Sequence, residues 1–198
     1  MYPSLFPLLA FAFATSITPG PNNALVMMTA ANWGFRASLP AFFGVEVGFM
    51  VLLLATGFGL GGLFAAWPAL HLILKWACFA WLLVLAWKLA RTRSYDTGAP
   101  ADNRPLTFFQ MVLFQWVNPK AWMMTIGAVA LFVPVGSQPL VPVLRIILAY
   151  LIAGAPCVLV WAWFGLAIAR FLTNPRRVRI FNITMAVLLV LSLLPTLF

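Results

Sequence analysis

Acidic residues are almost absent from this chain. Of its 198 residues only three are acidic, Glu46, Asp96 and Asp102, and all charged residues together make up 8%. A soluble domain carries roughly 25% charged and 45–50% apolar residues. This chain is 64% hydrophobic, with a mean hydropathy of +1.03. A chain of this length cannot bury so much apolar surface in its own core, so the composition excludes an ordinary soluble domain and indicates a lipid bilayer.

Histidine and cysteine are scarce as well. The chain has one histidine, His71, and two cysteines, Cys78 and Cys157. Both cysteines lie inside apolar stretches, and their spacing is not that of metal ligands, so we expect no metal and no cofactor. A membrane-embedded enzyme would need a nucleophile with a base, or a metal cluster. These few residues argue against such an enzyme.

Basic residues outnumber acidic ones, since 12 Lys and Arg give a net charge of +9. In a soluble protein this excess would indicate a nucleic-acid partner. Here the basic residues lie between apolar stretches, where they orient a membrane protein. We therefore expect a lipid bilayer and no nucleic acid as the partner of these charges.

Six apolar stretches follow one another, each near the roughly 20 residues that cross a bilayer as a helix. We predict spans at about residues 4–30, 37–63, 70–90, 106–133, 143–169 and 180–197. Turns are expected at 91–105, 134–142 and 174–179. The predicted fold is an all-α polytopic membrane protein with about six transmembrane helices in a single domain, 1–198.

The basic residues also predict an orientation. They gather in the turns after the first, third and fifth spans, and the positive-inside rule places these turns in the cytoplasm and both termini outside. The residues are Arg36; Lys88, Arg91, Arg93 and Arg104; and Arg170, Arg176, Arg177 and Arg179.

Prolines interrupt the first and fourth spans, at Thr18-Pro19-Gly20-Pro21-Asn22-Asn23 and at Asn118-Pro119-Lys120. Proline removes a donor and clashes with the preceding helical turn, so we expect broken helices. A single break would favour a packing kink, whereas two at matched positions favour a binding site. Because each half, 1–100 and 101–198, has three spans, the halves must lie inverted, as in many secondary transporters.

The polar groups near the breaks suit a zwitterion. Asn118 is expected to cap a new helix at Pro119, and Asn22 or Asn23 to cap another. The helix N-termini and Lys120 would hold a carboxylate. Glu46, the acidic residue within a span, would hold an ammonium group, carry a proton, or form a structural ion pair with Lys120 or a cytoplasmic arginine. The predicted substrate site comprises Pro19, Gly20, Pro21, Asn22, Asn23, Glu46, Asn118, Pro119 and Lys120.

Gly44 and Gly48 flank Glu46 in a GxxxG pattern. Small residues at this spacing let helix backbones approach closely. We expect close helix packing here, either within the chain or at a dimer contact.

Several of these segments resemble the LysE/RhtB family of amino-acid exporters, in order along essentially the whole chain. They are the two proline motifs, Trp33-Gly34-Phe35-Arg36, the glycine-rich second span, Leu74-Lys75-Trp76-Ala77 and Leu85-Ala86-Trp87-Lys88. The double asparagine and Gly34-Phe35-Arg36 are most similar to the cysteine and O-acetylserine exporter branch. Glu46 departs from the polar, uncharged residue expected there in many members.

The resemblance implies a secondary transporter in the bacterial inner membrane. It would export amino acids or small amino-acid derivatives, driven by the proton gradient, and it would be compatible with a homodimer. A passive channel or a membrane-embedded enzyme is the alternative.

Overall fold

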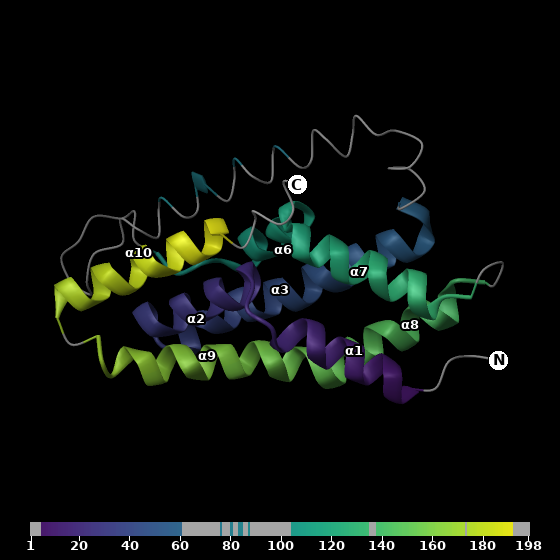
Figure 1. The fold of residues 1–198 in the computed structure, drawn as a ribbon, viewed down its shortest axis with the longest axis horizontal. Helices are drawn as coiled ribbons and strands as arrows, with labels where there is room; N and C mark the ends of the chain where they lie inside the picture. Colours follow the sequence, from purple (N-terminus) through teal and green to yellow (C-terminus); the bar gives the residue numbers. More distant parts are fainter. Residues whose placement is uncertain are drawn as a thin grey trace.

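The structure, a computed structural model, describes residues 5–60, 104–134, 138–172 and 174–191, together with residues 76, 80, 83, 84 and 87. All regular structure in these residues is helical, which confirms the predicted all-α class (Figure 1). The elements are α1 (Leu5–Ile17), α2 (Pro21–Trp33), α3 (Phe35–Ala55), η1 (Thr56–Leu60), α6 (Phe108–Val117), α7 (Pro119–Phe132), α8 (Leu140–Ala149), η2 (Tyr150–Gly154), α9 (Ala155–Ala169) and α10 (Pro175–Leu191).

Both predicted helix breaks lie at the prolines. The first predicted span divides into α1 and α2, and Pro21 is the first residue of α2. The fourth divides into α6 and α7, and Pro119 is the first residue of α7. Proline suits this position because its missing N–H would have no helical partner there.

Among the described residues, two helices are long and apolar enough to cross a membrane. One runs from Phe35 to Gly59 with mean hydropathy 2.0, and the other from Leu140 to Ala169 with mean hydropathy 2.3. Each contains a π-helical turn, η1 or η2, which inserts one extra residue into the helix. The third predicted span and the turn at 91–105 lie almost wholly outside the described residues.

Two predicted turns are shorter than expected, because helices begin inside them. The turn at 134–142 ends where α8 begins at Leu140. The basic turn at 174–179 was wrong over most of its length, since α10 begins at Pro175. The Asn174 side-chain oxygen accepts a hydrogen bond from the Arg177 backbone N–H at 2.9 Å, which caps the helix. Arginines suit a turn, but the cap at Asn174 starts the helix before them.

Glycines bring the helices into close contact. A Cβ on Gly44 or Gly48 would collide with α6, at Phe108 and Val112 respectively. A Cβ on Gly165 of α9 would collide with the Met27 carbonyl oxygen of α2, and these two helices lie side by side (Figure 1). The GxxxG face of α3 therefore packs within the chain and is covered by α6.

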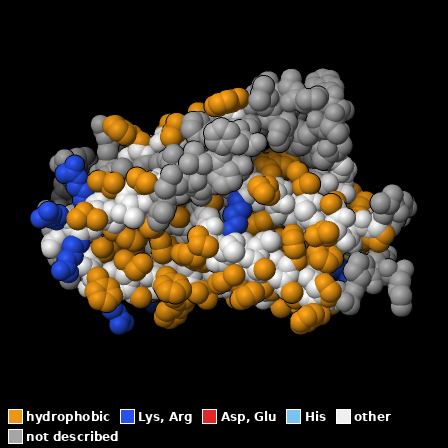
Figure 2. Space-filling model, in the orientation of Figure 1, with side chains coloured by type: hydrophobic (Ala, Val, Ile, Leu, Met, Phe, Trp, Pro, Cys, Tyr) orange, Lys and Arg blue, Asp and Glu red, His pale blue; other side chains and the backbone are white. Residues whose placement is uncertain are grey.

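The buried side chains form two clusters, one around Leu25, Met28 and Phe114 and the other around Leu52, Leu53 and Ile146. The outer surface is apolar as well: Phe6 is 78% exposed and Phe109 is 74% exposed (Figure 2). Apolar patches this extensive are unusual on soluble monomers and fit contact with lipid.

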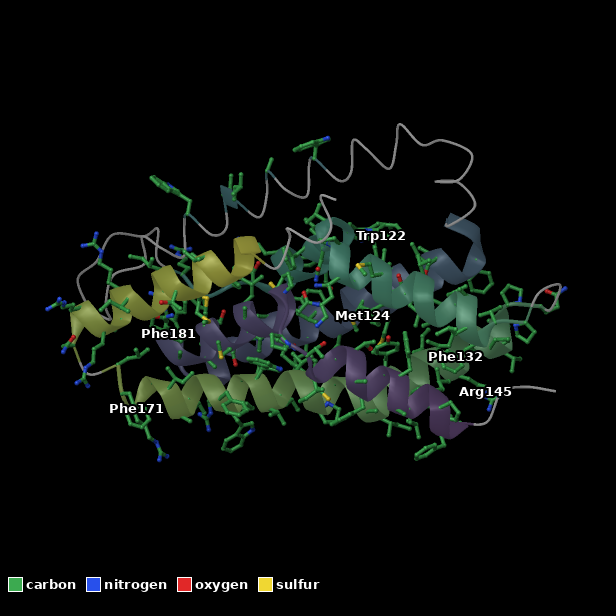
Figure 3. The ribbon with its side chains drawn as sticks, viewed as in Figure 1. Trp122, Met124, Phe132, Arg145, Phe171 and Phe181 are labelled. Carbon is green, nitrogen blue, oxygen red and sulfur yellow. The ribbon has the colours of Figure 1, made fainter. Side chains whose placement is uncertain are left out.

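Basic side chains gather at one end of the molecule, where α9 ends and α10 begins (Figures 1 and 2). Arg170, Arg176, Arg177 and Arg179 are all exposed there. Helix α1 begins at the opposite end, near Arg145 (Figure 3).

The glycine contacts generate a paired stability prediction. Gly165→Ala should destabilise the protein by about 1–3 kcal/mol, because the added methyl group forces α9 away from α2. Gly127→Ala is the matched control, because a Cβ there would lie at an ordinary 3.6 Å from Phe11. Thermal unfolding in detergent should show a lower Tm for Gly165→Ala and an unchanged or higher Tm for Gly127→Ala. Equal Tm values would contradict the close packing of α2 on α9.

Candidate functional site

A pocket of about 450 Å³, counted with the open space at its mouth, lies between the two broken helices, α3 and η2. Six of the nine predicted site residues line it: Gly20, Asn22, Asn23, Glu46, Asn118 and Lys120. Pro19, Pro21 and Pro119 do not line the pocket. They break the helices, and neighbouring side chains form the pocket wall.

The first break leaves backbone carbonyls at the end of α1 without helical partners, and side chains supply the missing donors. Asn23 Nδ2 donates to the carbonyls of Ser16 at 2.7 Å and Thr18 at 3.0 Å. Trp161 Nε1 of α9 donates to the Ile17 carbonyl at 3.1 Å. The broken end of α1 is thus held by α2 and by a helix from the other half of the chain.

Lys120 completes this arrangement from α7. Its Nζ donates to the Thr18 carbonyl at 2.8 Å, the Thr18 hydroxyl at 2.9 Å and the Pro19 carbonyl at 3.2 Å. An ammonium group has three donors, so these contacts use all of them. The carbonyl end of a helix carries partial negative charge, which favours a cation there. A Cβ on Gly20 would lie only 2.6 Å from Lys120 Cδ, so glycine leaves room for the lysine.

The predicted N-cap of α7 is confirmed, and the predicted N-cap of α2 is wrong. Asn118 Oδ1 accepts a hydrogen bond from the Lys120 backbone N–H at 3.1 Å and caps α7 as expected. The N-cap of α2 is Gly20, with no side-chain hydrogen bond. Asn22 and Asn23 do not cap α2, because the helix already begins at Pro21 and both residues lie within its first turn.

Asn22 belongs to an amide cluster that joins the two breaks. Its Nδ2 donates to Gln115 Oε1 at 2.8 Å, and its Oδ1 accepts from Gln115 Nε2 and Asn118 Nδ2, both at 3.0 Å. Gln115 has no exposed surface. Sequence reasoning missed Gln115, although an amide three residues before the Asn118 break was an available signal.

Glu46 faces the pocket from α3. Among the described residues its carboxyl group has no hydrogen bond and no ion pair. The alternative of a structural ion pair with Lys120 is therefore not supported, because the three Lys120 donors bind the end of α1. A carboxyl group within a membrane span is costly unless it is paired, and such residues are candidates for a substrate or proton pathway.

Tyr150 and Thr15 also line the pocket and were missed from the sequence. The Tyr150 hydroxyl lies 3.2 Å from Thr15 Oγ1. Thr15 donates its single proton to the Phe11 carbonyl at 2.8 Å, so Tyr150 is the donor in this pair. Tyr150 begins η2, and π-helical turns are frequent at functional sites. The signal was present, because Tyr150 is the tyrosine that lies within a predicted span.

The rest of the wall is apolar. Val45, Phe49, Met124 and Val158 line it, and the rings of Phe49 and Tyr150 lie 4.7 Å apart. Met124 lies near the middle of the molecule, whereas Arg145 and Phe171 lie at opposite ends (Figure 3). The pocket is thus far from both ends, and its lining combines polar and apolar side chains.

Comparison with known proteins adds a family. Residues 13–192 match the model for LysE type translocators. The cysteine/O-acetylserine efflux protein of Escherichia coli (strain K12) is 32% identical over 181 residues, which cover 91% of this chain and 90% of that protein. The protein of the same name from Shigella flexneri serotype 5b (strain 8401) is 33% identical over 190 residues, 93% of this chain and 95% of that protein. No solved structure matches significantly. The chain belongs to the LysE family of translocators.

Proposed function

We propose that this protein is a secondary transporter that exports a small amino acid or amino-acid derivative across the bacterial inner membrane. The observation that carries the proposal is the meeting of two helix breaks, one from each half of the chain, at one pocket. The breaks are joined there by Asn22, Gln115, Asn118 and Lys120. Irregular backbone at membrane depth is tolerated only inside protein or beside a water-filled cavity.

The packing supports a 3+3 inverted repeat with alternating access. The broken span of each half packs on the second span of the other half. In the first half, α1 contacts η2 and α2 contacts α9. In the second half, α6 and α7 both contact α3. Such an exchange is expected when two inverted halves enclose a central site. Rocking one half against the other would open the pocket to each side in turn.

The predicted residues take distinct roles in this proposal. Pro19, Pro21 and Pro119 break the helices, and Gly20 gives room to Lys120. Lys120 and Asn118 tie the second half to the first, together with Asn22 and Asn23. Glu46 provides the counter-charge for a substrate ammonium group, carries a proton, or does both.

The relatives indicate the substrate class. They are named as efflux proteins for cysteine and O-acetylserine, both small zwitterions. We propose cysteine, O-acetylserine or a similar small amino acid as the substrate.

The arginine-rich end faces the cytoplasm in this proposal, following the positive-inside rule, and both termini lie outside. We also propose a homodimer, because six helices make a thin wall around a central pocket. The Gly44 and Gly48 face is covered by α6, so a second copy would bind elsewhere.

A passive channel is the second candidate, whereas the match to translocators removes the membrane-embedded enzyme. A carrier must change conformation for each substrate molecule, so its rate saturates with substrate concentration. A channel would conduct without saturation.

Glu46→Gln tests the proposed charge at the pocket. In proteoliposomes, uptake of labelled L-cysteine should saturate for the native protein and fall at least about tenfold in the variant, because a charge-assisted hydrogen bond is lost. Glu46→Asp, which keeps the charge, should retain more activity. A native rate in Glu46→Gln, with unchanged thermal unfolding, would remove Glu46 from the mechanism.

Proton coupling has its own test. With the vesicle interior more acidic than the outside, protons leaving by exchange should drive L-cysteine inward above its equilibrium level. A protonophore should abolish this accumulation. Identical final levels with and without the pH gradient would exclude coupling to protons.

The amide cluster between the breaks generates a double-mutant cycle. Gln115→Leu should cost about 1–3 kcal/mol, because the Asn22 amide loses a buried partner. Combined with Asn22→Leu, the losses should be less than additive, with a coupling of about 0.5–3 kcal/mol in chemical unfolding. Asn32→Leu is the control, since Asn32 is about 15 Å farther along α2 and bonds to Asn182 instead. Additive losses for Asn22 and Gln115 would contradict the direct hydrogen bonds between these two side chains.

A further inference from the structure

The hydrogen bonds around the pocket leave its wall rich in acceptors and poor in free charged donors. All three protons of Lys120 are donated to the end of α1. Both N–H groups of Asn23 are donated to backbone carbonyls, which can only accept, so the orientation of this amide is fixed. Its Oδ1 is therefore left as an acceptor.

Two further acceptors lie on the same wall. The Tyr150 hydroxyl donates to Thr15, which leaves its oxygen lone pairs available. The Glu46 carboxyl group has no partner among the described residues. A primary ammonium group has three donors and no acceptor, and it complements Glu46, Asn23 and Tyr150 in both charge and number.

We infer that the pocket selects its substrate through the ammonium group and does not require a substrate carboxylate. The inference rests on the proposed function, because it assigns the substrate class of the same pocket. The ligands it predicts are small primary ammonium compounds. They include amino-acid esters, in which the carboxylate charge is absent, as well as amino acids.

The charges on the wall explain why the two ends of a zwitterion differ. A substrate ammonium offsets the cost of the unpaired Glu46 carboxylate, and charge-assisted hydrogen bonds are the strong ones. A substrate carboxylate could reach Lys120 only by displacing it from the Thr18 and Pro19 carbonyls. Those carbonyls would then lose their cationic partner at the negative end of α1, which the helix dipole disfavours.

Two isomers distinguish recognition of the substrate ammonium group from recognition of its carboxylate. O-acetyl-L-serine has a free ammonium group, whereas N-acetyl-L-serine has the same atoms and a carboxylate but no ammonium group. L-serine methyl ester has the ammonium group and no carboxylate. Binding of each freshly dissolved compound to the detergent-solubilised protein at neutral pH would be measured by calorimetry.

We expect O-acetyl-L-serine and L-serine methyl ester to bind with affinities within about threefold of each other. N-acetyl-L-serine should bind at least about tenfold more weakly, because it cannot form the charged hydrogen bond to Glu46. Glu46→Gln should reduce the preference between the two isomers, and Tyr150→Phe should weaken both ammonium ligands without reversing their order.

The outcomes that overturn the inference differ from those that overturn the proposed function. Tight binding of N-acetyl-L-serine, or loss of binding by the methyl ester alone, would show that the carboxylate is recognised and would sink the inference while leaving an amino-acid site. Failure of all three compounds and of L-cysteine to bind would overturn both. The comparison of isomers uses the native protein, so it holds even if a variant does not fold.

Discussion

The contact between the Lys120 ammonium group and the open carbonyl end of α1 is the interaction on which the central region depends. It places a cation from the second half of the chain at the negative end of a helix from the first half. It also supplies donors to carbonyls that the break after α1 leaves without helical partners. Together with the amide cluster of Asn22, Gln115 and Asn118, it ties the two breaks to each other.

The same requirement explains the polar composition around both breaks. Backbone groups that the prolines release need partners, and side chains near the breaks and on α9 supply several of them. Asn23 turns back to α1, Trp161 reaches over from α9, and Asn118 caps α7. Binding residues and structural residues are thus interleaved on one wall. Most polar side chains there are saturated by the fold, and Glu46 is left with a carboxyl group that has no described partner.

Saturation of Lys120 changes the picture of recognition that charge alone suggested. One basic and one acidic residue at membrane depth pointed to a site for both ends of a zwitterion. In the part of the chain that the structure describes, Lys120 binds backbone carbonyls, whereas the Glu46 carboxyl group has no partner. The glycine spacing likewise allowed two interpretations, packing within the chain or contact with a second copy. In the structure Gly44 and Gly48 pack against α6 of the same chain.

The sequence by itself determined the lipid environment, the all-α class, the position of both helix breaks and six of the residues on the pocket wall. These follow from composition and from proline, whose effects are local and independent of partners. Only the tertiary structure decided which donor meets which acceptor. Asn22 bonds to Gln115, 93 residues away in the chain, and Thr15 bonds to Tyr150, 135 residues away. Asn23 bonds to the Ser16 and Thr18 carbonyls across the first break. Hydrogen bonds between distant segments depend on how helices pack, and no local pattern in the chain encodes that packing.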